Sequence, residues 1–431
     1  MVHIAETTNP WGGHSFVSDN PSMSLPLDNR TLYEKNPTPP AGIDLGSGSS
    51  RARGSSLNTK LFHSSLFDIG ILRDTLLPSL TLHTGLSLVA YGAARYTNRL
   101  EFKDWLWPSG SVINAWWSAL GKRVLVDGIP LSSAWAIVDR PQRLLLTGVT
   151  LWGSRLLYRV VSRASKRENA KDDPRYEIVK KQSGWSWNKA LFSIFLPEAV
   201  FQSLITLPFT APFRHLSGSD CPFSSLSGGY VALGQAIAVG LFSMGFALEA
   251  LADYQLKKFK EKEKSGKEDH SHMCREGVWS IVRHPNYLGD MLVHLSFPLL
   301  LFASNALQPI HLLGPLTNYI FLRYVSGDKE NEHSQARRYS TENVNKKIDF
   351  DKYRREENAF WPDTSQVSNK WTWIVVGAGW NSLKMGMKAV EMGYSVGSEL
   401  GFQEAMILAK EGQDVAQLFA GSGVELSDFF A

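Results

Sequence analysis

Apolar runs alternate with basic connecting segments along most of the chain. Residues 75–94 and 291–322 contain no Asp, Glu, Lys or Arg, and shorter or less pure apolar runs lie between them, at 105–120, 144–161, 190–213 and 228–252. A helix of about 20 residues crosses about 30 Å of hydrocarbon. Lipid offers no partner for backbone N–H and C=O groups, so a spanning segment must be helical. We predict an all-α transmembrane bundle of about six or seven spans.

Two features refine this count. Residues 291–322 are long enough for two spans, and Gln308-Pro309 near the middle predicts a tight hairpin there. The run 144–161 carries Arg155 and Arg159 four residues apart on one helical face, so it fits either a span or an interfacial helix.

The connecting segments predict the orientation. Residues 161–189 and 254–283 each carry eight Lys or Arg, whereas Arg214 is the only one in residues 213–227. Basic connections remain on the cytosolic side of a membrane. We therefore expect the two basic segments to face the cytosol.

The two ends of the chain are polar. Residues 1–66 are rich in Ser, Pro, Gly and Asn and predict a disordered leader. Residues 67–362 form the predicted membrane domain, and residues 363–431 a soluble tail with a helix near 402–419. Gly377-Ala378-Gly379 follows an apolar run, as a dinucleotide loop follows a strand, but the third glycine is missing and a plain loop is favoured.

Composition excludes several classes of partner. A dispersed net charge of +4 does not provide the basic face that nucleic-acid binding requires. Cys221 and Cys274 fall on opposite sides of the predicted membrane, which argues against a disulfide framework or a cysteine zinc site. His270 and His272 alternate with Cys274 in a Lys-rich loop that we expect to be solvated, so we predict no metal.

Carboxylates within apolar runs need an explanation, because a charge at the bilayer centre costs about 2.5–3.5 kcal/mol. Glu198 is one such residue. Glu249 is another, and it shares a helical face with Asp253. Both pairing with arginine and a functional role remain open for these groups.

The segment with the strongest local pattern is Arg283-His284-Pro285-Asn286-Tyr287-Leu288-Gly289-Asp290, where a basic loop enters an apolar run. Pro285 favours an extended His284 and a helix start, and Gly289 permits close packing. The free N–H groups of the helix start, together with Arg283 and His284, predict an anion site suited to nucleotide phosphates. Asn286 and Asp290 lie on one face and offer an amide and a carboxylate for a ribose, carboxamide or adenine.

Several ordered blocks carry a resemblance to a known family. They are GFALEALADYQLKKFK (245–260), GVWSIVRHPNYLGD (277–290), VSGDKENE (325–332) and YRREENAFWP (353–362), with LEFKDWLWPSG, LWGSRLLYRVVSR and DDPRYEIVKK upstream. The chain resembles the membrane family whose C-terminal domain is similar to steroid 5-alpha-reductase, and RHPNYLGD is equally similar to delta-14 and delta-24 sterol reductases.

This resemblance implies an NADPH-dependent reductase of a carbon-carbon double bond in a sterol, steroid or other lipid. The implied cofactor-binding residues are Asp253, Lys260, Arg283, His284, Asn286, Tyr287 and Asp290, with Glu330 and Glu332 near the entrance. Tyr287, Glu249 and Asp104 are the candidate proton donors, of which Tyr287 and Glu249 are the catalytic candidates. The implied location is the endoplasmic reticulum membrane, with a mitochondrial membrane as the alternative.

Two other classes remain open. The Arg-His-Pro pattern is also similar to isoprenylcysteine carboxyl methyltransferases and phospholipid methyltransferases, which bind S-adenosylmethionine. Asn286, Asp290, the block Asp253-Tyr254-Gln255 and the block Val325-Ser326-Gly327 favour the reductases. The third class is a membrane scaffold of the same fold without enzymatic activity.

Overall fold

The computed structural model describes residues 72–167, 172–214, 228–325 and 327–391, all of which belong to one compact unit, residues 57–431. These residues form helices and no strand, as the apolar pattern predicts. The leader, the helix expected near residue 410 and Cys221 lie outside the described residues.

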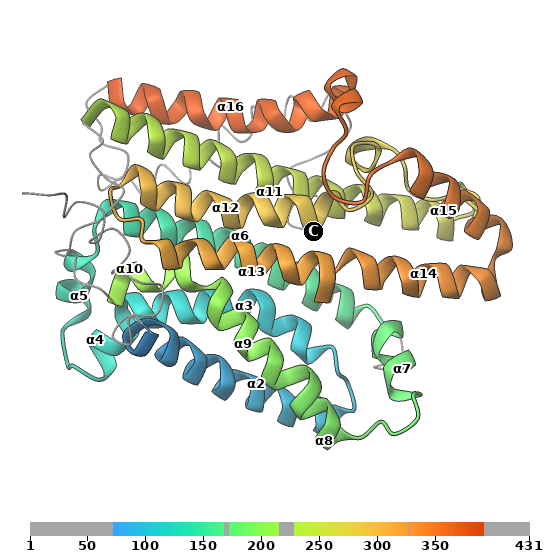
Figure 1. Cartoon of the computed structure of the whole chain (residues 1–431), viewed down its shortest axis with the longest axis horizontal. Helices are drawn as coiled ribbons and strands as arrows, with labels where there is room; N and C mark the ends of the chain where they lie inside the picture. Colours follow the sequence, from blue (N-terminus) through green and yellow to red (C-terminus); the bar gives the residue numbers. More distant parts are fainter. Residues whose placement is uncertain (1–71, 168–171, 215–227, 326, 392–431) are drawn as a thin grey trace, which may run out of the picture. The chain divides into compact units, whose positions relative to one another are not determined.

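The described residues from 72 to 165 form the first group of helices, which follow one another along the chain (Figure 1). They are α2 (Leu77–Thr97), α3 (Phe102–Trp116), α4 (Lys122–Leu125), α5 (Leu131–Ile137) and α6 (Arg140–Ser165), with π-helical turns at Leu72–Leu76 and Trp117–Gly121. The start of α6 is fixed by reciprocal hydrogen bonds between Asp139 and Gln142, each side chain accepting from the other's backbone N–H.

The apolar run 190–213 folds as a broken helix. Helix α7 (Pro174–Lys180) precedes it. The run itself is formed by α8 (Trp187–Ala190), the π turn Leu191–Phe195, α9 (Leu196–Ile205), the 3-10 turn Leu207–Phe209 and α10 (Ala211–Arg214). The two parts of this run meet at 53°. Pro208 lies in the break, where a proline removes a backbone donor.

The second half carries the long helices (Figure 1). They are α11 (Gly228–Lys264), α12 (Pro285–Ala303), α13 (Leu313–Ile320), α14 (Asp328–Glu342), α15 (Val344–Glu356) and α16 (Lys370–Glu391), with short 3-10 or π turns at Gly277–Ser280, Pro309–Leu312, Phe321–Val325 and Thr364–Ser368. Residues 304–308 separate α12 from the turn that begins at Pro309, so the break predicted near Gln308-Pro309 is present, but the second span of the predicted hairpin is not confirmed.

The expected number of spans is not confirmed. Within the described ranges, Tyr230–Lys264 and Pro285–Ala303 are long and apolar enough to cross a membrane, and the broken pair Trp187–Ile205 with Leu207–Arg214 adds a third if it counts as one span. The expected runs 75–94, 105–120 and 144–161 and the second half of 291–322 are not among these candidates. Helix α6 includes several arginines, α3 has 15 residues, and α13 has eight residues, only about 12 Å of helix. The candidate spans indicate an integral membrane protein.

Close helix contacts set the position of α11. A Cβ on Gly289 would lie 2.6 Å from the Gly245 carbonyl oxygen and 2.7 Å from the Glu249 amide nitrogen, so α11 and α12 approach as the Gly289 pattern predicts. On its other side α11 packs against α16, where a Cβ on Gly379 would lie 2.7 Å from the Gly240 carbonyl oxygen. Gly377-Ala378-Gly379 is therefore inside a helix, and both the loop and the strand-loop interpretations are wrong.

Candidate functional site

The turn before α12 is held by the last of the quoted sequence blocks, residues 353–362. Pro285 occupies the first turn of the helix, and the backbone N–H groups of Arg283 and His284 donate to the carbonyls of Asn358 and Ala359, at 2.9 and 3.1 Å. Residues about 75 positions apart in the sequence thus fix the helix entrance.

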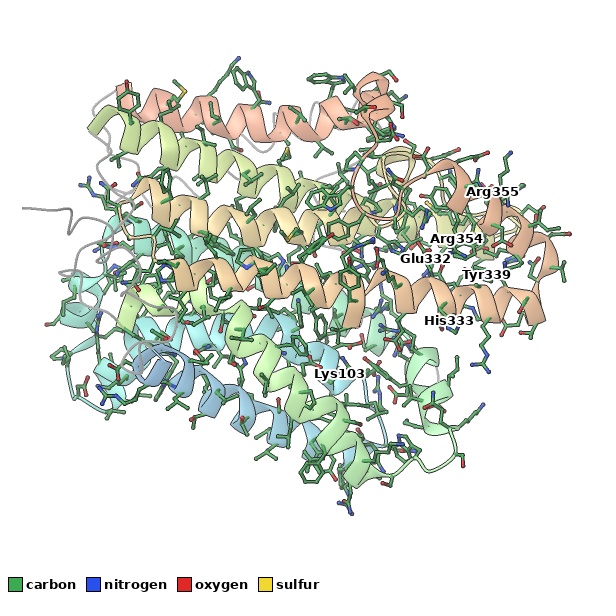
Figure 2. The ribbon with its side chains drawn as sticks, viewed as in Figure 1. Lys103, Glu332, His333, Tyr339, Arg354 and Arg355 are labelled. Atoms are coloured by element: carbon green, nitrogen blue, oxygen red, sulfur yellow. The ribbon has the colours of Figure 1, made fainter. Side chains whose placement is uncertain are left out.

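Glu332 on α14 binds both cationic candidates of this turn. Its carboxylate accepts from Arg283 Nε at 2.9 Å and from His284 Nε2 at 3.0 Å, and it also pairs with Arg354, which lies beside it (Figure 2). Burial lowers the pKa of His284, and the hydrogen bond and charge of Glu332 only partly offset this. Burial acts to raise the pKa of Glu332, but His284 and Arg283 outweigh it and lower that pKa. Glu332 therefore balances one of the positive charges of Arg283 and Arg354, and the anion site expected from Arg283 and His284 stays a prediction.

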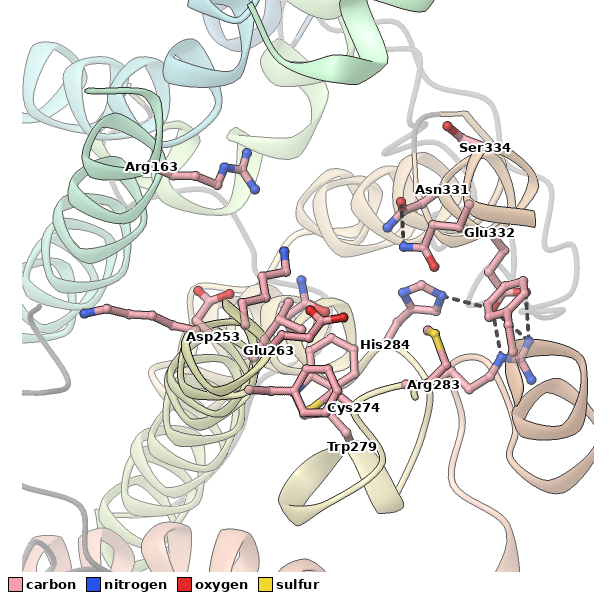
Figure 3. Close-up of a pocket in the computed structure, with 18 of the residues that line it drawn as sticks. Arg163, Asp253, Glu263, Cys274, Trp279, Arg283, His284, Asn331, Glu332 and Ser334 are labelled. Atoms are coloured by element: carbon pink, nitrogen blue, oxygen red, sulfur yellow. Dashed lines mark hydrogen bonds and ion pairs between the residues drawn. The ribbon is translucent and has the colours of Figure 1, made fainter. Parts of the chain in front are cut away.

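A cavity of about 610 Å³ lies beside the turn, between the ends of α6, α7, α11 and α12 and the pair α14 and α15 (Figure 3). Its volume falls within the usual range of about 300–1,000 Å³ for ligand sites. Its wall includes the aromatic rings of Phe259, Trp279, Tyr287, Tyr339 and Tyr353. The position and size of the cavity suit a nucleotide-sized ligand.

The cavity wall is strongly basic. Eleven Lys or Arg face five Asp or Glu, a formal excess of six positive charges. The basic residues are Arg159, Arg163, Lys166, Arg167, Arg175, Lys257, Lys260, Lys264, Arg283, Arg338 and Lys346. Like charges gathered around a cavity repel one another unless an anion enters, so this wall favours a polyanionic ligand.

One stripe of α11 contributes free cations. Lys257, Lys260 and Lys264 lie at intervals of three and four residues, hence on one helical face, and all three line the cavity. Among the described residues no carboxylate lies within 4 Å of their ammonium groups. The charges of Arg159, Arg163 and Arg338 act on Lys260 from α6 and α14. We call these three residues the lysine stripe.

The inner end of the cavity carries an unused amide. Asn286 Oδ1 is buried and has no hydrogen-bond partner within the described part of the chain. Beside it the rings of His284 and Tyr287 stack with their centroids 5.3 Å apart and a 7° interplanar angle. A buried acceptor without a partner costs free energy, so a ligand N–H, such as that of a carboxamide, would satisfy it.

Six of the seven expected cofactor-binding residues line this one cavity, namely Asp253, Lys260, Arg283, His284, Asn286 and Tyr287, and Glu332, expected near its entrance, lines it too. Glu249 and Asp290 do not. Asp104 lies behind the wall, where it pairs with Arg175. Glu198 pairs with Lys103 at 3.0 Å, which supports the structural interpretation of that carboxylate.

Glu249 and Asp253 both bind Arg155 on α6. Arg155 Nη2 is 2.5 Å from Glu249 Oε1, and Arg155 Nη1 donates to Asp253 Oδ2 at 3.1 Å. Asp253 also lies 3.6 Å from Arg159 Nε. Of the two proton-donor candidates, Glu249 is thus buried in an ion pair, whereas Tyr287 faces the cavity.

Asp290 belongs to a second buried cluster. Its carboxylate is 2.7 Å from His294 Nδ1 and accepts from Asn318 Nδ2 at 3.3 Å. The His294 ring meets Trp152 edge-on, with centroids 4.7 Å apart. Asp290 therefore connects α12 with α13 and lies behind the cofactor-sized cavity rather than in its wall.

Sequence reasoning missed the wall formed by α7. The block DDPRYEIVKK places Arg175 in the cavity wall and holds it with Asp104, whose Oδ2 accepts from Arg175 Nη2 at 2.9 Å. Asp172 accepts from the backbone N–H groups of Leu100 and Glu101 and so holds the segment that leads into α3. The block contained the signal, but its partner elements were not predictable from the local pattern.

Comparison with known proteins places this cavity in a family context. Residues 90–356, more than half of the chain, match the model of a family described as "Protein of unknown function (DUF1295)". The chain belongs to the DUF1295 family. No curated protein and no solved structure matches it.

The DUF1295 match encloses the whole candidate site. Every residue that lines the cavity lies between Arg159 and Tyr353, inside the matched region. Helix α16 lies beyond the match and packs against α11 on a different face from α12. The cavity is thus built from residues of the DUF1295 region alone.

Proposed function

We propose that this protein is an NADPH-dependent membrane reductase that acts on a carbon-carbon double bond of a sterol, steroid or other lipid. The observation that carries the proposal is the basic cavity at the mouth of α12, with its lysine stripe and its unpartnered Asn286 amide oxygen. NADPH is a polyanion with a carboxamide, so it matches both the charge and the free acceptor.

The residues present suit this cofactor. The lysine stripe offers point charges for phosphates, and Asn286 would accept from the carboxamide. The stacked pair His284 and Tyr287 offers a flat surface for a ring. When bound, the cofactor supplies a hydride.

The chain itself would supply the proton. Tyr287 lines the cavity beside Asn286, so its hydroxyl is the better placed of the two donor candidates. Glu249 is held by Arg155 behind the wall.

An apolar substrate would approach from the membrane side of α11 and α12, which are candidate spans. We propose an endoplasmic reticulum location, with a mitochondrial membrane as the alternative.

Charge also separates this proposal from the methyltransferase alternative. S-adenosylmethionine carries a sulfonium and no phosphate, so an excess of positive charge in the wall disfavours it. A ligand that binds only the folded state raises the midpoint of thermal unfolding by mass action. We expect NADPH to stabilise the protein purified in detergent and S-adenosylmethionine to leave it unchanged.

The same experiment can refute the proposal. Stabilisation by S-adenosylmethionine alone would support a methyltransferase, and no effect of either ligand would support the scaffold. A candidate lipid that accelerates NADPH oxidation would then identify the substrate.

A further inference from the structure

Three arginines converge on one carboxylate at the α7 side of the cavity. Asp173 Oδ2 is 3.0 Å from Arg167 Nη2 and 3.9 Å from Arg163 Nη2, and Asp173 Oδ1 accepts from Arg175 Nε at 3.1 Å. Asp173 also caps α7, accepting from the Arg175 backbone N–H at 3.0 Å. Burial acts to raise the pKa of Asp173, but Arg175 and Arg163 lower it to about 2. Asp173 therefore remains charged and holds the arginines at neutral pH.

A second carboxylate fixes Arg175 from behind. Asp104 on α3 accepts from Arg175 Nη2 at 2.9 Å and also from the Tyr176 hydroxyl. The side chains of Arg175 and Arg163 nevertheless remain 41% and 48% exposed, and both line the cavity. A guanidinium has five donors, so each retains N–H groups that can reach a ligand.

The two exposed guanidinium groups lie near the inner part of the cavity. The charges of Arg163 and Arg175 both act on Tyr287, and that of Arg163 also acts on Lys260. Figure 3 shows Arg163 extending from its helix toward the space faced by His284 and Asn331. Arg163 and Arg175 therefore form the α6 and α7 side of the cavity wall, close enough to Tyr287 for their charges to act on it.

We infer that Arg163 and Arg175, oriented by Asp173 and Asp104, bind the diphosphate that joins the two nucleosides of the cofactor. The inference rests on the proposed function. Arginine forks bind phosphate oxygens in pairs, and carboxylates behind them fix their direction before the ligand arrives. A diphosphate lies in the middle of a dinucleotide, and both arginines line the same cavity as Tyr287 and Lys260.

Three ligands separate the possible phosphate positions. NADPH contains both the diphosphate and the 2′-phosphate, ADP-ribose contains only the diphosphate, and adenosine 2′-monophosphate contains only the 2′-phosphate. Quenching of tryptophan fluorescence in the full chain in detergent gives a Kd for each ligand. The variants are Arg175→Gln and Arg163→Gln, and Arg337→Gln is the matched control, because Arg337 is exposed on α14 and outside the cavity wall.

We expect each cavity variant to raise the Kd of NADPH and of ADP-ribose by about tenfold or more, the usual effect of losing a hydrogen bond to a charged group. Binding of adenosine 2′-monophosphate should not change, and Arg337→Gln should affect none of the three ligands. Arg175→Lys should recover part of the loss, because it restores the charge without the fork.

Other outcomes overturn the inference. Weaker binding of adenosine 2′-monophosphate with unchanged binding of ADP-ribose would assign the arginines to a monophosphate. Unchanged binding of all three ligands would show that the arginines do not contact the ligand. Arg163→Gln keeps the test decisive if Arg175→Gln does not fold, because the one ion pair of Arg163 among the described residues is the 3.9 Å contact with Asp173. Failure of the unmodified protein to bind NADPH would instead refute the proposed function itself.

Discussion

Replacing Gly289 with alanine tests the close approach of α11 and α12. The added Cβ would meet the Gly245 carbonyl oxygen at 2.6 Å and the Glu249 amide nitrogen at 2.7 Å, both rigid backbone atoms. Ordinary carbon contacts begin near about 3.5 Å, so the helices must separate by almost an ångström. Both helices line the cavity, so the change should also disturb ligand binding.

The magnitude follows from two opposing effects. Overpacking costs about 1–3 kcal/mol, and the two backbone contacts place Gly289→Ala near the upper end. Alanine recovers about 1 kcal/mol of helix propensity. The net loss is about 2 kcal/mol, which lowers the thermal midpoint by about 3 °C for roughly 300 folded residues with about 2.1 cal/mol/K of unfolding entropy each.

Gly92→Ala on α2 is the matched control. No atom lies within 4 Å of its added Cβ, so only the gain in helix propensity applies and the midpoint should rise slightly. Both midpoints are measured in the same detergent by tryptophan fluorescence. Equal rises in the two variants would show that α11 and α12 are not in the contact described.

Three further changes test the site. Folding lowers the pKa of His284, so the unfolded chain takes up the proton first and stability should fall as the pH drops below about 6.5. His284→Gln should flatten the decline of the thermal midpoint between pH 7 and 5.5. An unchanged slope would contradict this prediction. Lys260→Gln should raise the NADPH Kd by about tenfold and weaken its salt dependence, whereas Lys262→Gln, on the same helix but outside the cavity wall, should do neither; equal effects would point to general charge instead of a site. Asn286→Ala should reduce NADPH affinity at unchanged thermal stability, because the Asn286 Oδ1 atom has no partner among the described residues. Asp290→Ala should reduce thermal stability, because Asp290 loses its buried contacts with His294 and Asn318. The reverse pattern would assign Asp290 to ligand binding and Asn286 to stability.

Much of the helical architecture follows from local pattern. The apolar runs, the break near Gln308-Pro309 and the close packing at Gly289 depend on neighbouring residues, and all three were predictable. The convergence of six expected residues on one cavity also agrees with the sequence, because the quoted blocks supply most of its wall.

The remaining features depend on tertiary contacts. Glu332 pairs with Arg283 from 49 residues away, and Asp104 pairs with Arg175 from 71 residues away. Neither contact could be predicted from the residues next to it in the sequence. Helix α16 contains glycines that resemble a loop in isolation, and only packing against α11 explains them. The expected number of spans is not confirmed, because apolar content does not reveal whether a run is continuous, as the break near Pro208 shows.

The length of α11 has a consequence for access. Its 37 residues extend about 56 Å, well beyond the roughly 30 Å needed to cross hydrocarbon. The residues from Asp253 onward that line the cavity form its final three turns. One continuous helix, a candidate membrane span, thus extends into the cavity wall. For the proposed reductase, this arrangement would let the lipid substrate stay in the bilayer while the charged cofactor binds from the aqueous side.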